Sequence, residues 1–252
     1  MKENKYDNEQ FFEAYSKFPR SVEGLTAAGE WHELQKMLPS FTGKRVLDIG
    51  CGFGWHCIYA AQQGASYVLG TDISANMLAG ASQKTKALGE EISSKIEYEQ
   101  LAMEDMNFPP SSFDIVISSL AFHYTPDFAA VCQRIYACLA PGGNFVFSVE
   151  HPVFTAQGTQ TWYQGTNGEN VHWPVDSYFI EGKREATFLG EQVTKYHKTL
   201  TTYLNTLLQT GFTITAMVEP QPAPHLLETV KGMRDELRRP MMLLVSAKKN
   251  EA

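Results

Sequence analysis

Residues 46–54 read VLDIGCGFG, and this stretch decides the fold. The apolar residues before Gly50 predict a buried strand, and the alternating glycines predict a tight turn that opens a helix near Phe53. Glycine accepts backbone angles that other residues resist, and its missing side chain lets a ligand approach the main chain closely. The stretch therefore predicts a strand, a ligand-binding turn and a helix, the first unit of a nucleotide-binding α/β sheet.

Two carboxylates restrict the kind of ligand that this turn can hold. Asp48 stands just before the first glycine, where it would repel a pyrophosphate and attract the ammonium of a ligand that carries an amino acid. The glycine spacing is GxGxG, whereas dinucleotide sites carry GxGxxG. Asp72 follows about 20 residues later at the end of the second predicted strand, where an acid can accept both hydroxyls of a ribose. A helix cap is the alternative role for Asp72, but Ser74 already provides that cap.

The elements around the turn alternate between strands and helices. Helices are predicted over residues 8–18, 29–38 and 53–64, after the Ser74 cap, from Thr125-Pro126 onward, and over 199–209 and 225–239. Strands are predicted over residues 44–49, 67–69, 95–98, 113–118, 144–149, 212–218 and 241–247, with a hairpin over 178–198 that turns near Gly182 or Gly190. This alternation predicts a parallel, doubly wound sheet, to which the C-terminal strands add a reversed strand at the edge.

Residues 151–177 interrupt the alternation, because they are rich in Gly, Thr, Gln and Asn and show no periodicity. A loop this long in a compact domain is usually functional or disordered. It also carries Trp162, Tyr163 and Trp173, which can enclose an apolar ligand and exclude water. We therefore expect a lid with His151 at its hinge and these aromatic rings facing inward. A structural flap that seals the edge of the sheet is the alternative.

Composition narrows the class of protein. The 252 residues are 43% hydrophobic and 19% charged, which is typical of one globular domain with a sizeable core. The net charge of −7 argues against extensive contacts with nucleic-acid phosphates. The sequence has no apolar run of membrane-spanning length and no apolar signal core at its N-terminus, so we expect a cytoplasmic protein. The four cysteines form no zinc-binding spacing and are expected to be buried thiols: Cys51, Cys57, Cys132 and Cys138.

Four stretches together resemble the class I S-adenosylmethionine-dependent methyltransferases. They are VLDIGCGFG at 46–54, GTDIS at 70–74, AMEDMNFPPSSFDIVIS at 102–118 and LAPGG at 139–143. These stretches are similar in style to those of the small-molecule branch, methyltransferase type 11, which includes quinone-biosynthesis enzymes. The resemblance covers about residues 40–150 and continues loosely to the end. It implies a Rossmann-like α/β fold with seven strands, one of them antiparallel, plus an N-terminal helical cover and an insertion after the fifth strand.

The resemblance also implies how a single domain over residues 1–252 is divided. The helical cover spans 1–40, the cofactor-binding core 41–150, the lid with its hairpin 151–198, and the C-terminal part of the sheet 199–252. Many relatives carry an aspartate that contacts the adenine amine where this chain has Ala102, so Glu104 or Asp105 is expected to replace it. The implied cofactor-binding residues are Asp48, Gly50, Cys51, Gly52, Gly54, Asp72, Ile73, Met77, Met103, Glu104 and Ser118, with Tyr15, Arg20 and Trp31 from the cover.

Residues after the fourth and fifth strands are expected to serve the methyl acceptor, because ligands bind beyond the carboxyl ends of such strands. His123 and His151 are candidate bases, and a structural, hydrogen-bonded histidine is the alternative for each. Tyr124, Trp162, Trp173 and His197 are candidate acceptor-binding residues, with lid packing as the alternative. The sequence SSLA at 118–121 lacks the [ND]PP[YFW] pattern of amino-methyltransferases that act on nucleic-acid bases, which argues against such a substrate.

The expected reaction is transfer of a methyl group from S-adenosylmethionine to an oxygen, nitrogen, sulfur or activated carbon of a small molecule. The displacement is in-line, so positioning supplies much of the rate. No metal, nucleic acid or membrane is expected to take part. Two alternatives stay open: a non-catalytic protein that binds S-adenosylmethionine, and an NAD-dependent oxidoreductase, which the glycine spacing and Asp48 disfavour. The sequence leaves the acceptor and the oligomeric state undetermined.

Overall fold

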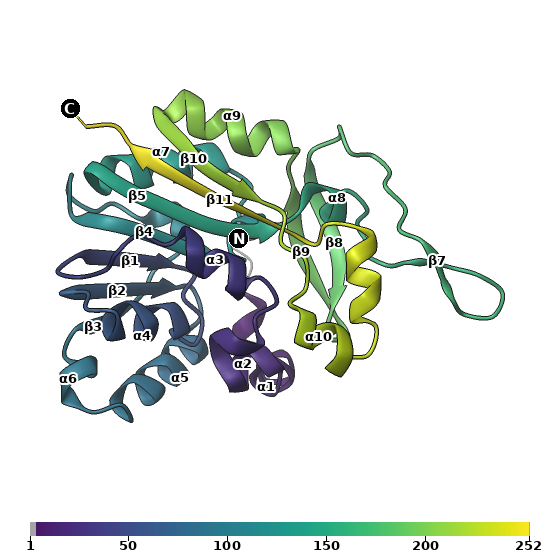
Figure 1. Cartoon of the computed structure of the whole chain (residues 1–252), viewed down its shortest axis with the longest axis horizontal. Helices are drawn as coiled ribbons and strands as arrows, with labels where there is room; N and C mark the ends of the chain where they lie inside the picture. Colours follow the sequence, from purple (N-terminus) through teal and green to yellow (C-terminus); the bar gives the residue numbers. More distant parts are fainter. Residues whose placement is uncertain (1–3, 252) are drawn as a thin grey trace.

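The computed structural model describes residues 4–251, which form one large sheet with helices on both faces (Figure 1). Its seven strands follow the order β10-β11-β5-β4-β1-β2-β3. The strands of this sheet are β1 (Arg45–Ile49), β2 (Tyr67–Asp72), β3 (Ile96–Gln100), β4 (Phe113–Ser119), β5 (Leu139–Glu150), β10 (Phe212–Val218) and β11 (Met242–Lys249). The predicted fold class is confirmed, because β1 to β5 pair in parallel and β11 pairs antiparallel with both β5 and β10.

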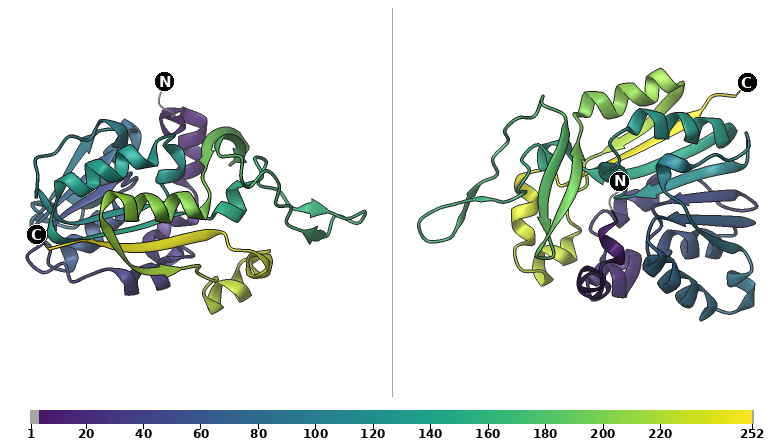
Figure 2. Two further views of the ribbon diagram at one scale, coloured as in Figure 1. Left: turned by 90° about the horizontal axis from the view of Figure 1, so that it is seen from above. Right: turned by 180° about the vertical axis from the view of Figure 1, so that it is seen from behind.

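Helices cover both faces of the sheet, as Figure 2 shows. The helices α7 and α9 bury apolar side chains such as Ile135 and Leu207 in one core, and α4 buries Cys57 and Ile58 in another. The helices are α1 (Glu9–Ser16), α2 (Pro19–Glu23), α3 (Trp31–Met37), α4 (Trp55–Gln62), α5 (Ala75–Lys86), α6 (Glu90–Ser93), α7 (Phe128–Cys138), α8 (Pro152–Thr155), α9 (Leu200–Thr210) and α10 (Pro224–Thr229). Single 3-10 turns are η1 (Lys5–Asp7), η2 (Gly24–Ala27), η3 (Met103–Asp105), η4 (Phe122–Tyr124) and η5 (Met233–Arg238).

Three predicted boundaries were wrong, each for a local reason. The helix expected from Thr125-Pro126 begins at Phe128, because the Asp127 carboxylate caps it by accepting from the amide of Ala130 at 2.9 Å. The helix expected over 225–239 divides into α10 and η5 at Gly232, which adopts a φ of +84°. The strand expected over 144–149 is longer, because β5 already pairs with β4 at Leu139.

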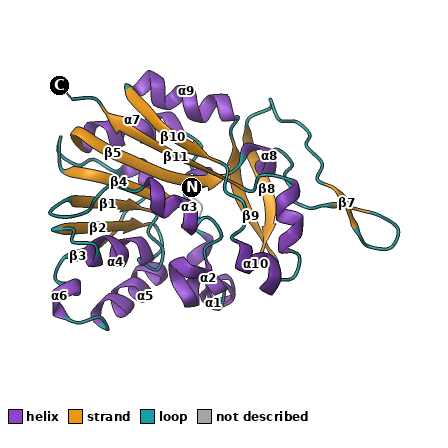
Figure 3. Ribbon diagram, in the orientation of Figure 1, coloured by secondary structure: helices purple, strands orange, loops and turns teal. Residues whose placement is uncertain are grey.

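The segment after β5 is more ordered than its composition predicts. It contains α8 and a short hairpin of β6 (Tyr163–Gln164) and β7 (Asn170–His172), which projects away from the sheet in Figure 3. The hairpin predicted over 178–198 is present as β8 (Gly182–Phe188) and β9 (Glu191–His197), and it turns at Leu189 and Gly190. This second hairpin stands across the end of the sheet where β5 finishes.

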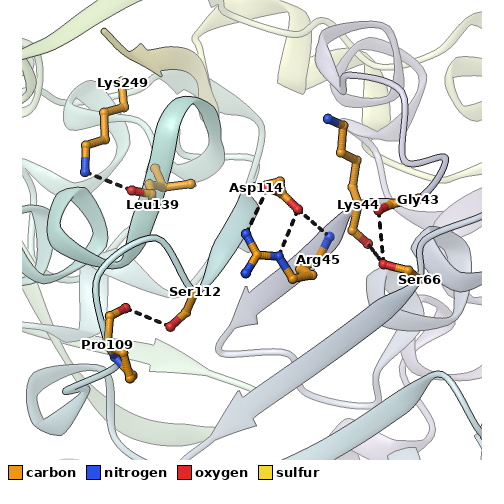
Figure 4. A network of polar contacts seen from close by, with 9 residues as sticks. All are labelled: Gly43, Lys44, Arg45, Ser66, Pro109, Ser112, Asp114, Leu139 and Lys249. Atoms are coloured by element: carbon orange, nitrogen blue, oxygen red, sulfur yellow. Dashed lines mark hydrogen bonds and ion pairs between the residues drawn. The ribbon is translucent and has the colours of Figure 1, made fainter. Parts of the chain in front are cut away.

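The amino ends of the strands are held by polar contacts remote from the carboxyl ends (Figure 4). Asp114 at the start of β4 accepts from the Arg45 amide at 2.8 Å and from its guanidinium at 3.1 and 3.2 Å. Lys249 Nζ donates to the Leu139 carbonyl at 2.8 Å, and Ser66 Oγ donates to the Lys44 carbonyl at 3.1 Å. These contacts therefore fix where neighbouring strands begin.

We expect Asp114→Asn to lower the free energy of unfolding by about 1 kcal/mol at pH 7, because it removes a partly exposed, charge-assisted contact. Hydrogen bonds from Arg45 lower the pKa of Asp114 below its ordinary 3.8. The stabilisation is therefore complete above that unfolded value and is lost as the pH falls through the folded pKa. Urea unfolding at pH 7 and at about pH 3 checks this. An equal difference at both pH values would contradict it.

Residues 4–251 include no helix that is both long enough and apolar enough to span a membrane. Within the same residues, no three histidine, cysteine or acidic side chains gather as a metal site would require.

Candidate active site

A cavity of about 920 Å³ lies beyond the carboxyl ends of β1, β2, β4 and β5. Its wall includes a residue from each of these ends, namely Gly50, Asp72, Ser119 and Glu150, and most of the wall is apolar. The carboxyl ends of parallel strands are where open α/β sheets bind ligands. The fold thus places the motif residues and the segment after β5 around one space.

The glycine turn forms one side of this cavity through Gly50 and Gly52, which adopt φ values of +69° and +53°. The amide of Gly50 donates to the Thr71 carbonyl at 2.8 Å, so the turn is tied to β2. A Cβ on Gly50 would lie 2.6 Å from the Cβ of Ala121, so any larger residue would collide there. Both the backbone angles and the packing therefore require glycine, and the main chain of the turn faces the cavity.

Asp72 ends β2 at the cavity wall and holds the glycine turn in place. Its Oδ2 accepts from the Gly52 amide at 2.9 Å, and its Oδ1 accepts from the Ser74 amide at 2.9 Å. Burial raises the pKa of Asp72 above its ordinary value, and the two amides oppose that shift. Each carboxylate oxygen can accept a second hydrogen bond, so Asp72 can still receive two hydroxyl donors from a ligand.

Five residues of the expected cofactor set lie outside the described wall of the cavity: Trp31, Asp48, Cys51, Gly54 and Ser118. Asp48 is buried behind the turn, where Cys57 Sγ donates to its Oδ2 at 3.3 Å. Burial raises the pKa of Asp48 to about 7. Ser118 Oγ donates to the Ile49 carbonyl at 2.8 Å. These contacts hold Asp48 and Ser118 behind the turn, and Asp48 Oδ1 has no hydrogen-bond partner among residues 4–251.

The N-terminal helices contribute a buried ion pair to the cavity. Tyr15 and Arg20 line it, and the Arg20 guanidinium donates to Glu30 at 2.6 Å and to Ser119 Oγ at 2.7 Å. Glu30 and Ser119 were not predicted, because nothing near them in the sequence marks a contact between residues so far apart. Trp31 is outside the described wall and packs against neighbouring aromatic rings instead.

The stretch after β2 and β3 lines a further part of the cavity. Ile73 lies just before α5, Met77 lies in its first turn, and Met103 and Glu104 come from η3. Ala102 also lines the cavity, beside the residues expected to replace the missing aspartate. The structure thus brings the residues expected at adenine together on the same side as Asp72.

His123 and Tyr124 in η4 both line the cavity, and their ring centres are 4.4 Å apart. Burial lowers the pKa of His123 to about 4, so its imidazole is neutral at pH 7. The hydroxyl of Tyr124 lies 3.2 Å from that of Tyr6, which was not predicted and also lines the cavity. These side chains cover the carboxyl end of β4.

His151 is placed differently from the expectation of a base near the acceptor. Its Nδ1 accepts from the Val153 amide at 3.1 Å and so caps α8. Its Nε2 lies 2.9 Å from the Glu219 carboxylate, and the residue is outside the described cavity wall. His151 therefore caps α8 through Nδ1 and lies within ion-pair distance of Glu219 through Nε2, and these contacts favour the structural alternative.

Of the aromatic residues expected to face inward, Trp162 lines the cavity. Trp173 stacks on Phe154 with ring centres 5.0 Å apart and donates to the Val153 carbonyl, outside the described wall. Tyr163 is 58% exposed. The segment after β5 therefore contributes one of these three rings to the cavity, while another builds its internal packing.

His197 is fully buried and outside the described cavity wall. Its Nδ1 lies 2.8 Å from Thr155 Oγ1, and its Nε2 lies 2.8 Å from the Tyr178 carbonyl. These contacts connect β9 to α8 and to the loop before β8. The position of His197 favours lid packing over contact with an acceptor.

A buried polar pair on the cavity wall was not predicted as part of the site. Lys195 from β9 donates to Glu150 at the end of β5 at 2.5 Å, and both residues line the cavity. The sequence indicated the region around Glu150, because this residue directly follows the fifth predicted strand. No sequence pattern marked Lys195, because it belongs to a separate hairpin.

Residues 47–147 match the family described as a methyltransferase domain. A crystal structure from Listeria monocytogenes, provisionally called an S-adenosylmethionine-dependent methyltransferase, is 55% identical to this chain. The match covers 90% of this chain and 100% of that one, with a TM-score of 0.83. An S-adenosylmethionine-dependent methyltransferase from Mesorhizobium loti is 42% identical over 89% of this chain and 100% of its own, with a TM-score of 0.80.

A curated relative has a stated acceptor. The demethylmenaquinone methyltransferase of Lactococcus lactis is 36% identical over 120 residues, which are 46% of each chain. This match is partial, whereas the two solved structures match along their whole length. Together with the glycine turn and Asp72 on one cavity, they establish that the chain belongs to the S-adenosylmethionine-dependent methyltransferases and has their enzymatic activity.

Proposed function

We propose that one half of the cavity binds S-adenosylmethionine and the other half binds a small methyl acceptor. The observation that carries this is the continuity of the cavity. It runs from the glycine turn and Asp72 to His123, Glu150 and Lys195 without leaving the carboxyl edge of the sheet. Such a space can hold two molecules whose reacting atoms must meet in line.

The residues on the glycine side suit the cofactor. Gly50 and Gly52 line the cavity without side chains, so the cofactor's amino-acid portion can approach the main chain of the turn closely. Asp72 can accept the ribose hydroxyls, and Ile73 can pack on the adenine. Arg20 can pair with the cofactor's carboxylate, because its guanidinium faces the cavity. The sulfonium of the bound cofactor supplies a methyl group that is already reactive.

The other side suits a small acceptor with an apolar body. Trp162, Phe188, Val193 and Met242 line the cavity, and such side chains favour a flat or aliphatic molecule and exclude water. The demethylmenaquinone enzyme acts on an acceptor of this kind, which supports the same class here. A screen of metabolite extracts with labelled methyl donor, read by mass spectrometry, identifies the acceptor.

Asp72→Ala is expected to weaken S-adenosylhomocysteine binding by about 10- to 100-fold, because charge-assisted hydrogen bonds to the ribose are lost. Isothermal calorimetry measures the affinity. In the unaltered protein, S-adenosylhomocysteine should raise the thermal midpoint and NAD should not, since a ligand of the folded state stabilises it.

Glu99→Gln is the matched control, because it removes a carboxylate from the exposed part of the adjacent strand β3. Its affinity for S-adenosylhomocysteine should equal that of the unaltered protein. Unchanged affinity in Asp72→Ala, with a normal thermal midpoint, would remove Asp72 from the cofactor site. Protection by NAD instead would overturn the proposed use of the cavity.

A further inference from the structure

Glu150 and Lys195 line the cavity, and Gln160 binds both of them from outside its described lining; the three side chains form what we call the polar wall. Lys195 Nζ donates to Glu150 Oε1 at 2.5 Å and to Gln160 Oε1 at 3.0 Å. Gln160 Nε2 donates to Glu150 Oε2 at 2.9 Å, so the three side chains form a closed ring of hydrogen bonds. The side chain of Lys195 is 3% exposed. Burying charge in this way is costly unless it is paired, and the ring provides that pairing.

Lys195 and the neighbouring His123 still have N–H groups that can donate hydrogen bonds. An ammonium has three N–H groups, and in the part of the chain that the structure describes two acceptors lie within hydrogen-bond distance of Lys195 Nζ. His123 lines the same cavity, and the charges of Glu150 and Lys195 both act on its pKa. Its buried Nδ1 has no hydrogen-bond partner among residues 4–251. In the neutral ring the proton therefore belongs on Nε2, because an N–H at Nδ1 would be buried and unsatisfied.

We propose that the polar wall recognises the oxygen of a phenolic or enolic methyl acceptor, which Lys195 Nζ and His123 Nε2 bind as an oxyanion. This inference rests on the proposed function and specifies the acceptor atom. The hydroxyl proton passes to solvent as the acceptor binds. The acceptor's oxygen then forms a bond to the methyl carbon, and the carbon–sulfur bond breaks with its electron pair remaining on sulfur. A methyl ether and a neutral thioether are the products.

Charge distinguishes an oxyanion from an amine at this wall. A protonated amine would lie against the ammonium of Lys195 and near the positive sulfonium, and both repel it. An oxyanion is attracted by the sulfonium and can accept a hydrogen bond from the Lys195 ammonium. Glu150 already neutralises Lys195, so the wall fits a single delocalised negative charge better than a doubly charged phosphate. Preorganised donors aimed at such an oxygen need no rearrangement during the reaction.

The test uses 4-nitrophenol, whose absorbance reports its ionisation, with the full-length protein and saturating S-adenosylhomocysteine. We expect binding to raise the ionisation constant of the phenol about tenfold, because charged hydrogen bonds favour the phenolate. Lys195→Met should abolish the rise. Lys183→Met removes a charge from an exposed position on the same hairpin and should preserve it. An absence of spectral change, or an equal change in Lys195→Met, would overturn the proposal.

A purely structural role for the ring predicts a different pattern. Lys195→Met leaves Glu150 buried without its partner, so this variant is expected to have a lower thermal midpoint. The single variant therefore does not separate a binding role of Lys195 from a structural one. The double variant Glu150→Gln/Lys195→Met removes both charges and should recover the midpoint while the phenolate shift stays absent. Recovery of the shift in the double variant would show that Lys195 acts through folding and would overturn the proposal.

The acceptor atom gives a second, independent readout. Extract incubated with the enzyme and a cofactor labelled with carbon-13 at the methyl group yields a product whose methyl chemical shift identifies the bonded atom. A methyl ether supports the proposal, and an N-methyl, S-methyl or C-methyl product overturns it. Binding of S-adenosylhomocysteine, measured separately, tests the proposed function, so the two hypotheses can fail independently.

Discussion

Gly52→Val is expected to reduce the affinity for S-adenosylhomocysteine by at least about 100-fold, equivalent to roughly 3 kcal/mol. Gly52 lines the cavity with a φ of +53°, and a Cβ there would lie 3.1 Å from Met77 Cε. That methionine end is flexible and can move, so the fold should survive. The branched side chain would instead fill the cradle of the cofactor and displace the amide that donates to Asp72. Calorimetry with S-adenosylhomocysteine measures the loss.

Gly89→Val separates backbone strain from occupation of the cavity. Gly89 has a φ of +87° and a ψ of 170°, a combination that favours glycine, and open space around its Cα, so valine there is strained by about 1–3 kcal/mol without touching the cavity. Both variants should therefore lose stability, and the Gly52 variant should also lose binding. Normal binding by a folded Gly52→Val protein would show that the turn is not the cofactor cradle.

Arg239→Ala is expected to lower the free energy of unfolding by about 2–3 kcal/mol and to loosen residues 151–177. The Arg239 guanidinium is buried 4.2 Å from the Trp173 ring centre and 4.6 Å from that of Phe154, and it pairs with Glu236 at 2.6 Å. These contacts hold the segment after β5 against η5, and both elements line the cavity. Urea unfolding and the rate of chymotrypsin cleavage within the segment measure the effect. Affinity for S-adenosylhomocysteine should stay within about threefold, because the glycine turn is not involved.

Two variants test whether the planar, buried cation is responsible. Arg239→Lys keeps the charge but loses the flat surface that stacks on the rings, so it should recover only part of the stability. Arg234→Ala removes an exposed guanidinium from η5, and it should cost less. Equal losses in Arg234→Ala and Arg239→Ala would contradict a specific role for Arg239. A large fall in cofactor affinity would favour a flap that seals the sheet.

The sequence predicted the centre of the sheet better than its periphery. The strands around VLDIGCGFG and GTDIS were found because each is a continuous apolar run that ends in residues with a definite backbone requirement. The helix at 225–239 was wrong, because its apolar spacing could not show that Gly232 adopts a positive φ. The hairpin β6–β7 lies in a stretch without periodicity, where neither strand nor helix has a local signal.

The predicted site divides in the same way. Gly50, Gly52 and Asp72 lie together at the cavity, as the order of strand, turn and second strand predicts. Asp48 was expected to face the ligand, yet it is buried behind the turn beside Cys57. Successive side chains in a strand point to opposite faces, so the direction of Asp48 depends on which face α4 covers. Packing determines which face α4 covers, and the residues of the motif do not indicate it.

The sequence by itself determined the strand, glycine turn and acid on which the proposed cofactor site rests, because these features depend on backbone angles and apolar runs within contiguous residues. Only the tertiary structure decided which distant polar groups meet at the cavity wall. Glu150 and Lys195 are 45 residues apart, and Arg20 and Ser119 are 99 apart. Such contacts form because the folded sheet and hairpins bury these polar groups in the same wall, where each must find a partner or pay for its lost water. Local sequence carries no record of which partner that will be.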